Sequence, residues 1–214
     1  MDFTATPDWS ALPAPADDGA AAHLVGLRLP SVPLLATDGQ TVDLSAQPGR
    51  VVVYAYPRTG VPDQPNPDGW DAIPGARGCT PQACAFRDHY AELKDLGVAA
   101  VYGLSTQDSS YQREAAGRLH LPFALLSDDA LALTNALRLP TFRVGPMVLL
   151  KRLTLIICNG TVEHASYPVF PPDRSAADVA RWLAARPTAP EVGRGIDCRT
   201  TRCNGLTGSV QRDR

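Results

Sequence analysis

The run "RVVVYAYP", residues 50–57, constrains the fold of this chain more than any other feature. After its arginine it is continuously apolar, whereas a strand with one face in water alternates apolar and polar residues. It therefore predicts a β-strand that is buried on both faces. Such a strand needs further structure packed on each side of its sheet, which indicates a layered domain.

Alternating strand and helix patterns on both sides of this run favour an α/β domain. Upstream, residues 29–45 predict a hairpin that turns at Asp38-Gly39. Downstream, the predicted order is a helix at 81–96 that ends at Gly97, a strand at 98–105, a helix at 110–120, a strand at 123–128, a helix at 130–138, a hairpin at 152–167 that turns at Asn159-Gly160, and a last helix capped by Ser175.

The length of 214 residues suits one domain with a buried core. Residues 1–23 and 187–214 carry few apolar side chains to offset the entropy lost on ordering. We therefore expect a flexible N-terminal tail, one domain at 24–186, and a flexible C-terminal tail.

Composition and charge argue against several classes of protein. The formal net charge of −2 provides no basic field for nucleic acid or for an anionic membrane. No apolar run approaches the roughly 20 residues that span a bilayer, and the first residues lack the basic and apolar regions of a secretory signal. The five cysteines are too few for a secreted disulfide scaffold, so we expect reduced thiols and a cytoplasmic location.

The stretch "GCTPQACAFRDHY", residues 78–90, carries the candidate chemistry. Cys79 falls between the buried strand and the predicted helix, where Thr80 suits the N-cap and Pro81 the first helical position. Unpaired backbone N–H groups and the positive end of the helix dipole favour a thiolate at such a point. Position alone fits either a reactive nucleophile or an inert buried thiol.

A second cysteine, Cys84, follows five residues later and is succeeded by Phe-Arg-Asp. This motif resembles the active-site helix of peroxiredoxins of the Q type, also called bacterioferritin comigratory proteins. The resemblance extends to "ATDGQTVDLS", "VVVYAYP", "FALLSD" and "RLTLIICNGTV", so it covers roughly residues 24–185. It implies a thioredoxin-like fold, with a central mixed β-sheet flanked by helices, and the reduction of hydroperoxides.

The resemblance also implies roles for individual residues. Cys79 matches the peroxidatic cysteine, Cys84 the resolving cysteine, and Arg152 the arginine that holds the thiolate and the peroxide oxygens. A guanidinium suits that task because it favours an anion and keeps its charge while donating hydrogen bonds. Without the cysteine motif, the simpler interpretation of Arg152 is a strand-edge arginine that faces water.

One departure from the family pattern concerns a threonine three residues before the peroxidatic cysteine. That position is Ala76 here, and an insertion at 60–77 separates Cys79 from Pro57. Thr59 is a candidate to take over the catalytic hydroxyl, and its alternative is a turn threonine with no catalytic part. The insertion, which contains Trp70, is a candidate lid because long loops in compact domains are usually functional or disordered.

The implied reaction needs no metal and no organic cofactor. Cys79 attacks the peroxide, Cys84 condenses with the resulting sulfenic acid, and a thioredoxin-like protein reduces the disulfide. Hydrogen peroxide and organic hydroperoxides are the implied substrates. We expect a monomer or weak dimer, without a nucleic-acid or membrane partner.

Two other functions stay open. A thiol–disulfide oxidoreductase on the same fold is disfavoured because the sequence has no Cys-x-x-Cys. A zinc-stabilised binding module could use Cys79, Cys84, Cys198 and Cys203, although no histidine supports it. Otherwise we expect Cys158 in the core and Cys198 and Cys203 as free thiols, with the alternative that one of them bonds Cys79.

Overall fold

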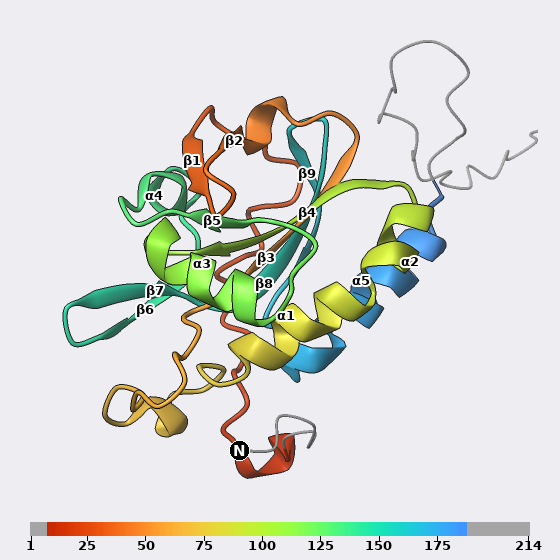
Figure 1. The fold of residues 1–214 in the computed structure, drawn as a ribbon. Helices are drawn as coiled ribbons and strands as arrows, with labels where there is room; N and C mark the ends of the chain where they lie inside the picture. Colours follow the sequence, from red (N-terminus) through yellow and green to blue (C-terminus); the bar gives the residue numbers. More distant parts are fainter. Residues whose placement is uncertain (1–7, 188–214) are drawn as a thin grey trace, which may run out of the picture.

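The computed structural model describes residues 8–187, whose strands form two sheets. The strands are β1 (Pro33–Ala36), β2 (Thr41–Asp43), β3 (Arg50–Ala55), β4 (Val98–Ser105), β5 (Leu125–Ser127), β6 (Thr141–Val144), β7 (Met147–Leu150), β8 (Leu153–Cys158) and β9 (Thr161–Ser166). Seven of them form one sheet in the order β2-β1-β5-β4-β3-β8-β9, and β6 pairs with β7 (Figure 1). β3 runs parallel to β4 and antiparallel to β8, so the predicted α/β domain with a central mixed sheet is confirmed.

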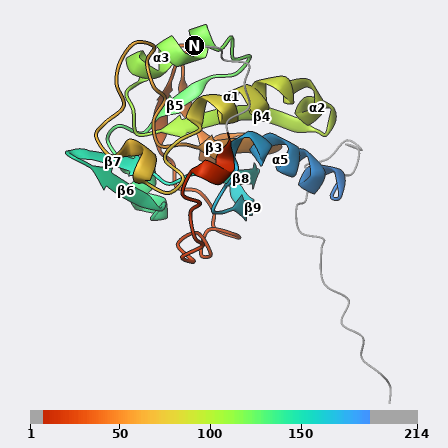
Figure 2. The ribbon, with the colours of Figure 1, turned by 90° about the horizontal axis from the view of Figure 1, so that it is seen from below.

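The helices flank the large sheet on both sides. They are α1 (Cys79–Asp88), α2 (Tyr90–Asp95), α3 (Ser109–Arg118), α4 (Ala132–Leu137) and α5 (Ser175–Ala184), with short 3-10 helices η1 (Trp9–Ala11), η2 (Leu44–Ala46), η3 (Trp70–Ala72) and η4 (Pro172–Arg174). Residues of α1, α2 and α5 share one core cluster, and residues of α4 belong to the cluster on the opposite face. Figure 2 shows α1 and α5 lying together over one side of the strands.

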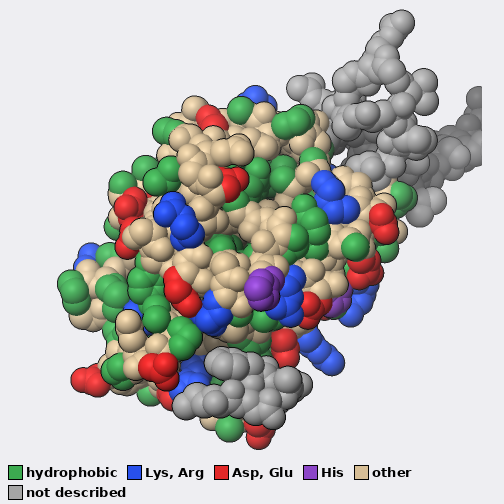
Figure 3. Space-filling model, in the orientation of Figure 1, with side chains coloured by type: hydrophobic (Ala, Val, Ile, Leu, Met, Phe, Trp, Pro, Cys, Tyr) green, Lys and Arg blue, Asp and Glu red, His purple; other side chains and the backbone are tan. Residues whose placement is uncertain are grey.

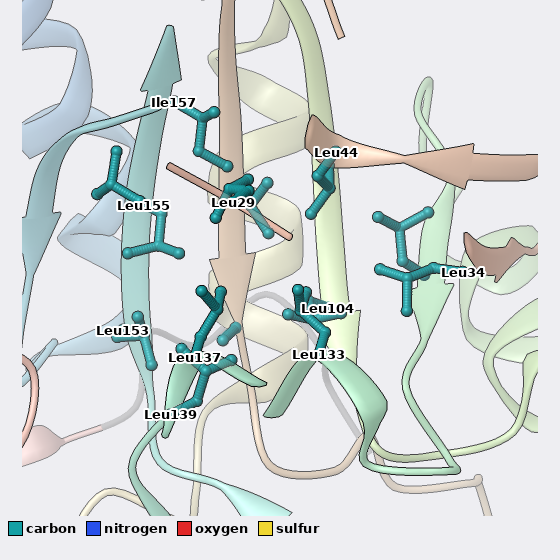
Figure 4. Close-up of a cluster of buried hydrophobic side chains, with 14 of the residues drawn as sticks. Leu29, Leu34, Leu44, Leu104, Leu133, Leu137, Leu139, Leu153, Leu155 and Ile157 are labelled. Atoms are coloured by element: carbon teal, nitrogen blue, oxygen red, sulfur yellow. The ribbon is translucent and has the colours of Figure 1, made fainter. Parts of the chain in front are cut away.

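The central strand is buried on both faces, as its sequence predicts. Every residue of β3 is buried. Its odd-numbered side chains at 51–55 join a leucine-rich cluster. Val52 and Tyr54, together with Tyr56 just after the strand, join the cluster beneath α1 and α5. Figure 4 shows the leucine-rich cluster, in which Leu153 and Leu155 of β8 lie alongside side chains from α4.

β8 continues this alternation and thereby orients Arg152. Leu153, Leu155 and Ile157 belong to the leucine-rich cluster, whereas Ile156 belongs to the cluster beneath α1 and α5. Arg152 lies an even number of residues before Ile156, so the period of two turns its side chain toward α1. The alternation of side chains along β8 therefore determines on which side of the sheet the Arg152 guanidinium lies.

The helix predicted at 81–96 differs from the structure at its start and in its middle. It is divided at His89 into α1 and α2, and α1 begins at Cys79. The N-cap is Gly78 rather than Thr80, because a left-handed residue with a φ of 103° turns the chain into the helix. Gly97, with a φ of 85°, ends α2 as expected.

The last helix begins one residue earlier than the predicted cap at Ser175 implies. Arg174 is the N-cap of α5 and Ser175 is its first residue. The Ser175 hydroxyl lies 3.0 Å from that of Thr154, inside the protein. A buried partner therefore outweighs the capping preference of serine at this point.

The β6–β7 hairpin was not predicted, and it explains where the inserted loop goes. Trp70 and Ala76 of the insertion are buried against Leu149 of β7. The ring of Trp70 lies 6.3 Å from that of Phe142 in β6. The far end of the insertion is thus packed onto a second small sheet.

The segment before β1 differs from the flexible tail that the sequence predicts for residues 1–23. From Asp8 onward it follows the surface of the domain, with Ala21 buried and Asp18 paired with Lys151 at 2.6 Å. Ala21 and Asp18 thus have partners that lie far away in sequence. Residues 188–214, which contain Cys198 and Cys203, lie outside the described part of the chain.

The described surface carries charges of both signs. On the face that Figure 3 shows, basic and acidic side chains are interspersed over the helices without a large area of one sign. None of the helices between residues 8 and 187 is long and apolar enough to cross a membrane.

Two turn glycines give a matched test of the packing. Gly160 has a φ of 76°, and a Cβ there would lie 2.3 Å from the Ser45 carbonyl oxygen, whereas Gly145, with a φ of 55°, has open space at that point. Gly145→Ala should lower the free energy of unfolding by about 1–2 kcal/mol, the penalty of a left-handed alanine. Gly160→Ala should lose a further 1–3 kcal/mol or so, because the backbone must shift. Urea unfolding measures both; equal losses would contradict the close contact with Ser45.

Candidate active site

The first turn of α1 presents the thiol of Cys79 inside the protein. Gly78 adopts a conformation that only glycine reaches easily, and a Cβ there would lie 2.3 Å from Cγ of Pro172 in η4. Cys79 follows as the first helical residue and is 5% exposed. The backbone N–H groups of the first turn have no intrahelical partner, so their positive potential falls on this sulfur.

Arg152 brings a cation to the same sulfur. One terminal nitrogen, Nη2, lies 3.4 Å from the Sγ of Cys79. The same nitrogen donates to the carbonyl oxygens of Gly75 at 3.3 Å and Arg77 at 3.1 Å. Arg152 is 3% exposed, so its charge acts on the thiol with little screening by water. The arrangement places a buried positive charge beside the Cys79 sulfur and excludes the alternative of a water-facing arginine.

Gln82 fixes the other side of the guanidinium, and the sequence analysis missed it. It is fully buried, and its Oε1 accepts a hydrogen bond from Nη1 of Arg152. Its Nε2 lies 3.5 Å from the Ser175 hydroxyl, which in turn contacts Thr154. The signal was present, because Gln82 occupies position i+3 from Cys79 on the buried face of α1.

Cys84 lies on the same helix in a different environment. It is half-buried, and both it and Cys79 are free thiols. Burial raises the pKa of the Cys84 thiol, and the nearby Arg87 only partly offsets that effect. On an intact α-helix, residues five apart have Cα atoms roughly 8.7 Å from each other. A disulfide needs about 4.4–6.8 Å, so the structure holds the two sulfurs apart.

Thr59 is buried, and its hydrogen bonds lead away from Cys79. Its backbone N–H donates to Oε1 of Gln107 at 2.9 Å, and its hydroxyl donates to the same oxygen at 3.3 Å. Its carbonyl oxygen accepts from the Tyr111 hydroxyl at 3.0 Å. At the position three before Cys79, the carbonyl oxygen of Ala76 lies 3.8 Å from Sγ.

Comparison with known proteins identifies the family. The model of the Redoxin family matches residues 24–181. Peroxiredoxin Q of Oryza sativa subsp. japonica is 33% identical over 160 residues, covering 74% of this chain and 65% of that protein. Peroxiredoxin Q of Sedum lineare is 33% identical over 160 residues, covering 74% of this chain and 76% of that protein. The chain belongs to the Redoxin family and, within it, to the peroxiredoxin Q type.

Solved structures agree on the fold. Peroxidoxin BcpB from Mycobacterium tuberculosis superimposes with a TM-score of 0.62 at 23% identity, covering 76% of this chain and 97% of that one. A structure of Xanthomonas campestris peroxiredoxin Q gives 0.59 at 24% identity, covering 75% and 96%. This peroxiredoxin therefore has the expected thioredoxin-like fold. It spans 65% of the length of the rice relative, just under two thirds.

Two further residues with reactive or titratable side chains are Cys158 and His89. Cys158 is 5% exposed at the end of β8, so its expected place in the core is confirmed. His89 contacts the carbonyl oxygen of Ala85 through Nδ1 at 2.9 Å, on its own helix. Between residues 8 and 187, no group of three or more His, Cys, Asp or Glu side chains could hold a metal ion.

Proposed function

We propose that this peroxiredoxin reduces hydroperoxides with Cys79 as the attacking thiolate. The observation that carries the proposal is the buried 3.4 Å contact between Sγ of Cys79 and the guanidinium of Arg152, at the start of a helix. The thiolate attacks one peroxide oxygen, the O–O bond breaks, and the other oxygen leaves and takes up a proton. Cys79 becomes a sulfenic acid, and water or an alcohol is released.

We propose that Arg152 favours the thiolate of Cys79 before the reaction and also stabilises the transition state of the attack on the peroxide. Negative charge moves from the sulfur to the leaving oxygen as the O–O bond breaks, and a fixed cation beside both stabilises that change. The guanidinium is already held by Gln82 and by two backbone carbonyls, so it needs no reorganisation during the reaction. Its Nε is buried without a partner among residues 8–187, which leaves one donor for the peroxide oxygens.

Cys84 is proposed as the resolving thiol. Its sulfur attacks the sulfenic sulfur of Cys79, a disulfide forms, and the sulfenic oxygen leaves as water. Because the intact helix keeps the two residues too far apart, the first turns of α1 must unwind for this step. Pro81 contributes no N–H to the helix, so little hydrogen bonding is lost there. Phe86 stacks on Tyr54 at 4.4 Å and 8° and anchors the rest of the helix.

An external dithiol protein of the thioredoxin type would then reduce the disulfide and complete the cycle. We propose hydrogen peroxide and organic hydroperoxides as substrates, as the resemblance to peroxiredoxins implies. Cys79 and Cys84 are free thiols, whereas Cys158 is disulfide-bonded, so the expectation that all the thiols are reduced is wrong and a cytoplasmic location stays a prediction. The part of Thr59 in positioning the peroxide, and a monomeric or weakly dimeric state, stay predictions.

The cysteine roles predict two different defects. Cys79→Ser should abolish peroxide consumption with a thioredoxin system, since no other thiol contacts Arg152 in the described structure. Cys84→Ser should still consume one peroxide per chain in a single turnover, and then accumulate sulfenic acid. Stopped-flow kinetics and intact-mass measurement check both. Full turnover by Cys79→Ser would refute the assignment.

Arg152→Lys should slow the reaction with peroxide by about a hundredfold, the loss typical when a fixed transition-state donor is removed. Lysine keeps the positive charge, but it lacks the several planar N–H donors of a guanidinium. It therefore cannot contact the two backbone carbonyls, Gln82 and the sulfur at the same time. The matched control is Arg181→Lys on the exposed face of α5, where the ion pair with Asp178 is open to water. Equal rates for the two variants would remove Arg152 from the reaction.

Disulfide formation should unwind α1 only in part. In the oxidised protein, amide exchange at residues 80–85 should be faster than in the reduced protein, while amides beyond Phe86 keep their protection because that ring is buried. Peptide mapping should find a Cys79–Cys84 bond. If Cys79 is bonded to Cys198 or Cys203 and exchange in α1 is unchanged, the resolving role belongs to the C-terminal part of the chain.

A further inference from the structure

An N-terminal segment, residues 8–18, packs on the start of the active-site helix. It precedes the region that matches the Redoxin family, which begins at residue 24. Figures 1 and 2 show this segment, in red, near the end of the domain where α1 begins. Its contacts include the residues immediately before Cys79 and η4, so it touches the part of the site that moves in the proposed resolving step.

Trp9 makes the closest of these contacts. Two carbons of its ring, Cη2 and Cζ3, would lie 2.9 and 3.1 Å from a Cβ on Gly78. Its indole N–H donates to Oδ2 of Asp173 at 2.8 Å, and its ring meets Phe170 edge-on at 6.1 Å. Pro172 lies against the same point of Gly78. The residue before Cys79 is thus enclosed by an indole and a proline ring.

The rest of the segment supports the loop that holds Arg152. The N–H of Gly75 donates to the carbonyl oxygen of Pro13 at 3.3 Å, and the ring of Pro15 would lie 3.3 Å from a Cβ on Gly75. The carbonyl oxygen of Gly75 accepts from Arg152. The segment therefore contacts both the loop that fixes the cation and the residue that begins the helix.

We propose that Trp9 is a positioning residue that holds the first turn of α1 in its folded, peroxide-reducing form and slows its unwinding. The proposal rests on the proposed function, in which Cys84 resolves Cys79. Bringing their Cα atoms into disulfide range requires a movement of about 2 Å, the difference between the helical separation and the upper limit for a disulfide. Gly78 is covalently joined to Cys79 and must move with it. That movement opens the contact between Gly78 and Trp9.

By slowing the unwinding of α1, Trp9 lengthens the time for which Cys79 remains a sulfenic acid. While the helix stays folded, Cys84 cannot reach Cys79, and a second hydroperoxide can oxidise the sulfenic acid to a sulfinic acid with release of water or an alcohol. Trp9 therefore sets the ratio between disulfide formation and overoxidation. It acts on the second half of the cycle through Gly78, without contacting the reacting atoms.

The test is Trp9→Ala in the full chain, reduced and then mixed with hydrogen peroxide. Disulfide formation should become about tenfold faster, because a hydrogen bond to a carboxylate and an edge-on aromatic contact are lost from the folded form. The sulfinic fraction of Cys79 at a fixed peroxide concentration should fall by a similar factor. The rate of sulfenic acid formation should change much less.

Two variants serve as controls. Ser10→Ala alters a neighbouring exposed side chain whose hydroxyl donates to Asp8, and it should behave as the wild type. Asp173→Asn weakens the hydrogen bond to the indole but keeps the ring in place, so it should shift both measurements in the same direction by a smaller factor. Asp173→Asn also keeps the proposal testable if Trp9→Ala does not fold.

A measurement on the unaltered protein is independent of any variant. Oxidation should raise amide exchange in residues 10–12 together with that in residues 80–85, because the segment loses its partner when the turn unwinds. Unchanged or slower disulfide formation in Trp9→Ala, with a Cys79–Cys84 bond present in the wild type, would overturn the role of Trp9 alone. Absence of that bond in the wild type would instead overturn the proposed resolving step.

Discussion

The rest of the site depends on the compensation of one buried cation. A guanidinium removed from water is strongly destabilising unless its donors find acceptors and its charge finds a partner. Arg152 is 3% exposed and donates to Gln82 and to the carbonyl oxygens of Gly75 and Arg77. The Sγ of Cys79 lies 3.4 Å from the same guanidinium, and Nε is the one donor left without a partner among residues 8–187. The Cys79 sulfur is the one group among these that can become an anion, so in the proposed reaction the same atom balances the buried charge and serves as the nucleophile.

This requirement explains the shape of the loop before α1. The carbonyl oxygens of two residues must point inward to Arg152, and the chain must then turn at once into a helix whose first residue is Cys79. A glycine with a φ of 103° at position 78 allows that turn, and another with a φ of 74° at position 75 lies where the loop meets Pro15. A side chain at Gly78 would in addition collide with Trp9 and Pro172. Local backbone chemistry and long-range packing therefore favour the same residue.

The sequence predicts correctly those elements whose structure depends on residues close together in the chain. Three features are each predicted from a few neighbouring residues, and the structure agrees with them. They are the unbroken apolar run of β3, the Asn159-Gly160 turn and the Gly-Cys-Thr motif. The start of α1 was misplaced because Thr80 is a good N-cap on local grounds, whereas the observed cap depends on contacts of Gly78 with residues distant in sequence. Gln82 was missed for a related reason. A glutamine on a helix is ordinarily a surface residue, and only the position of Arg152 gives it a buried partner.

Two segments for which the sequence predicts no helix or strand are both anchored to the domain by a tryptophan. The insertion at 60–77 and the N-terminal segment each contain a tryptophan, Trp70 and Trp9, that anchors an otherwise polar and proline-rich stretch to the domain. A single large aromatic ring can offset the ordering of several residues when it reaches a preformed surface, and no local pattern predicts that surface. Both segments meet at Gly75, where Pro15 approaches the end of the insertion. The additions to the common fold thus converge on the loop whose carbonyl oxygens hold Arg152, where they can influence the proposed chemistry without supplying any of the reacting groups.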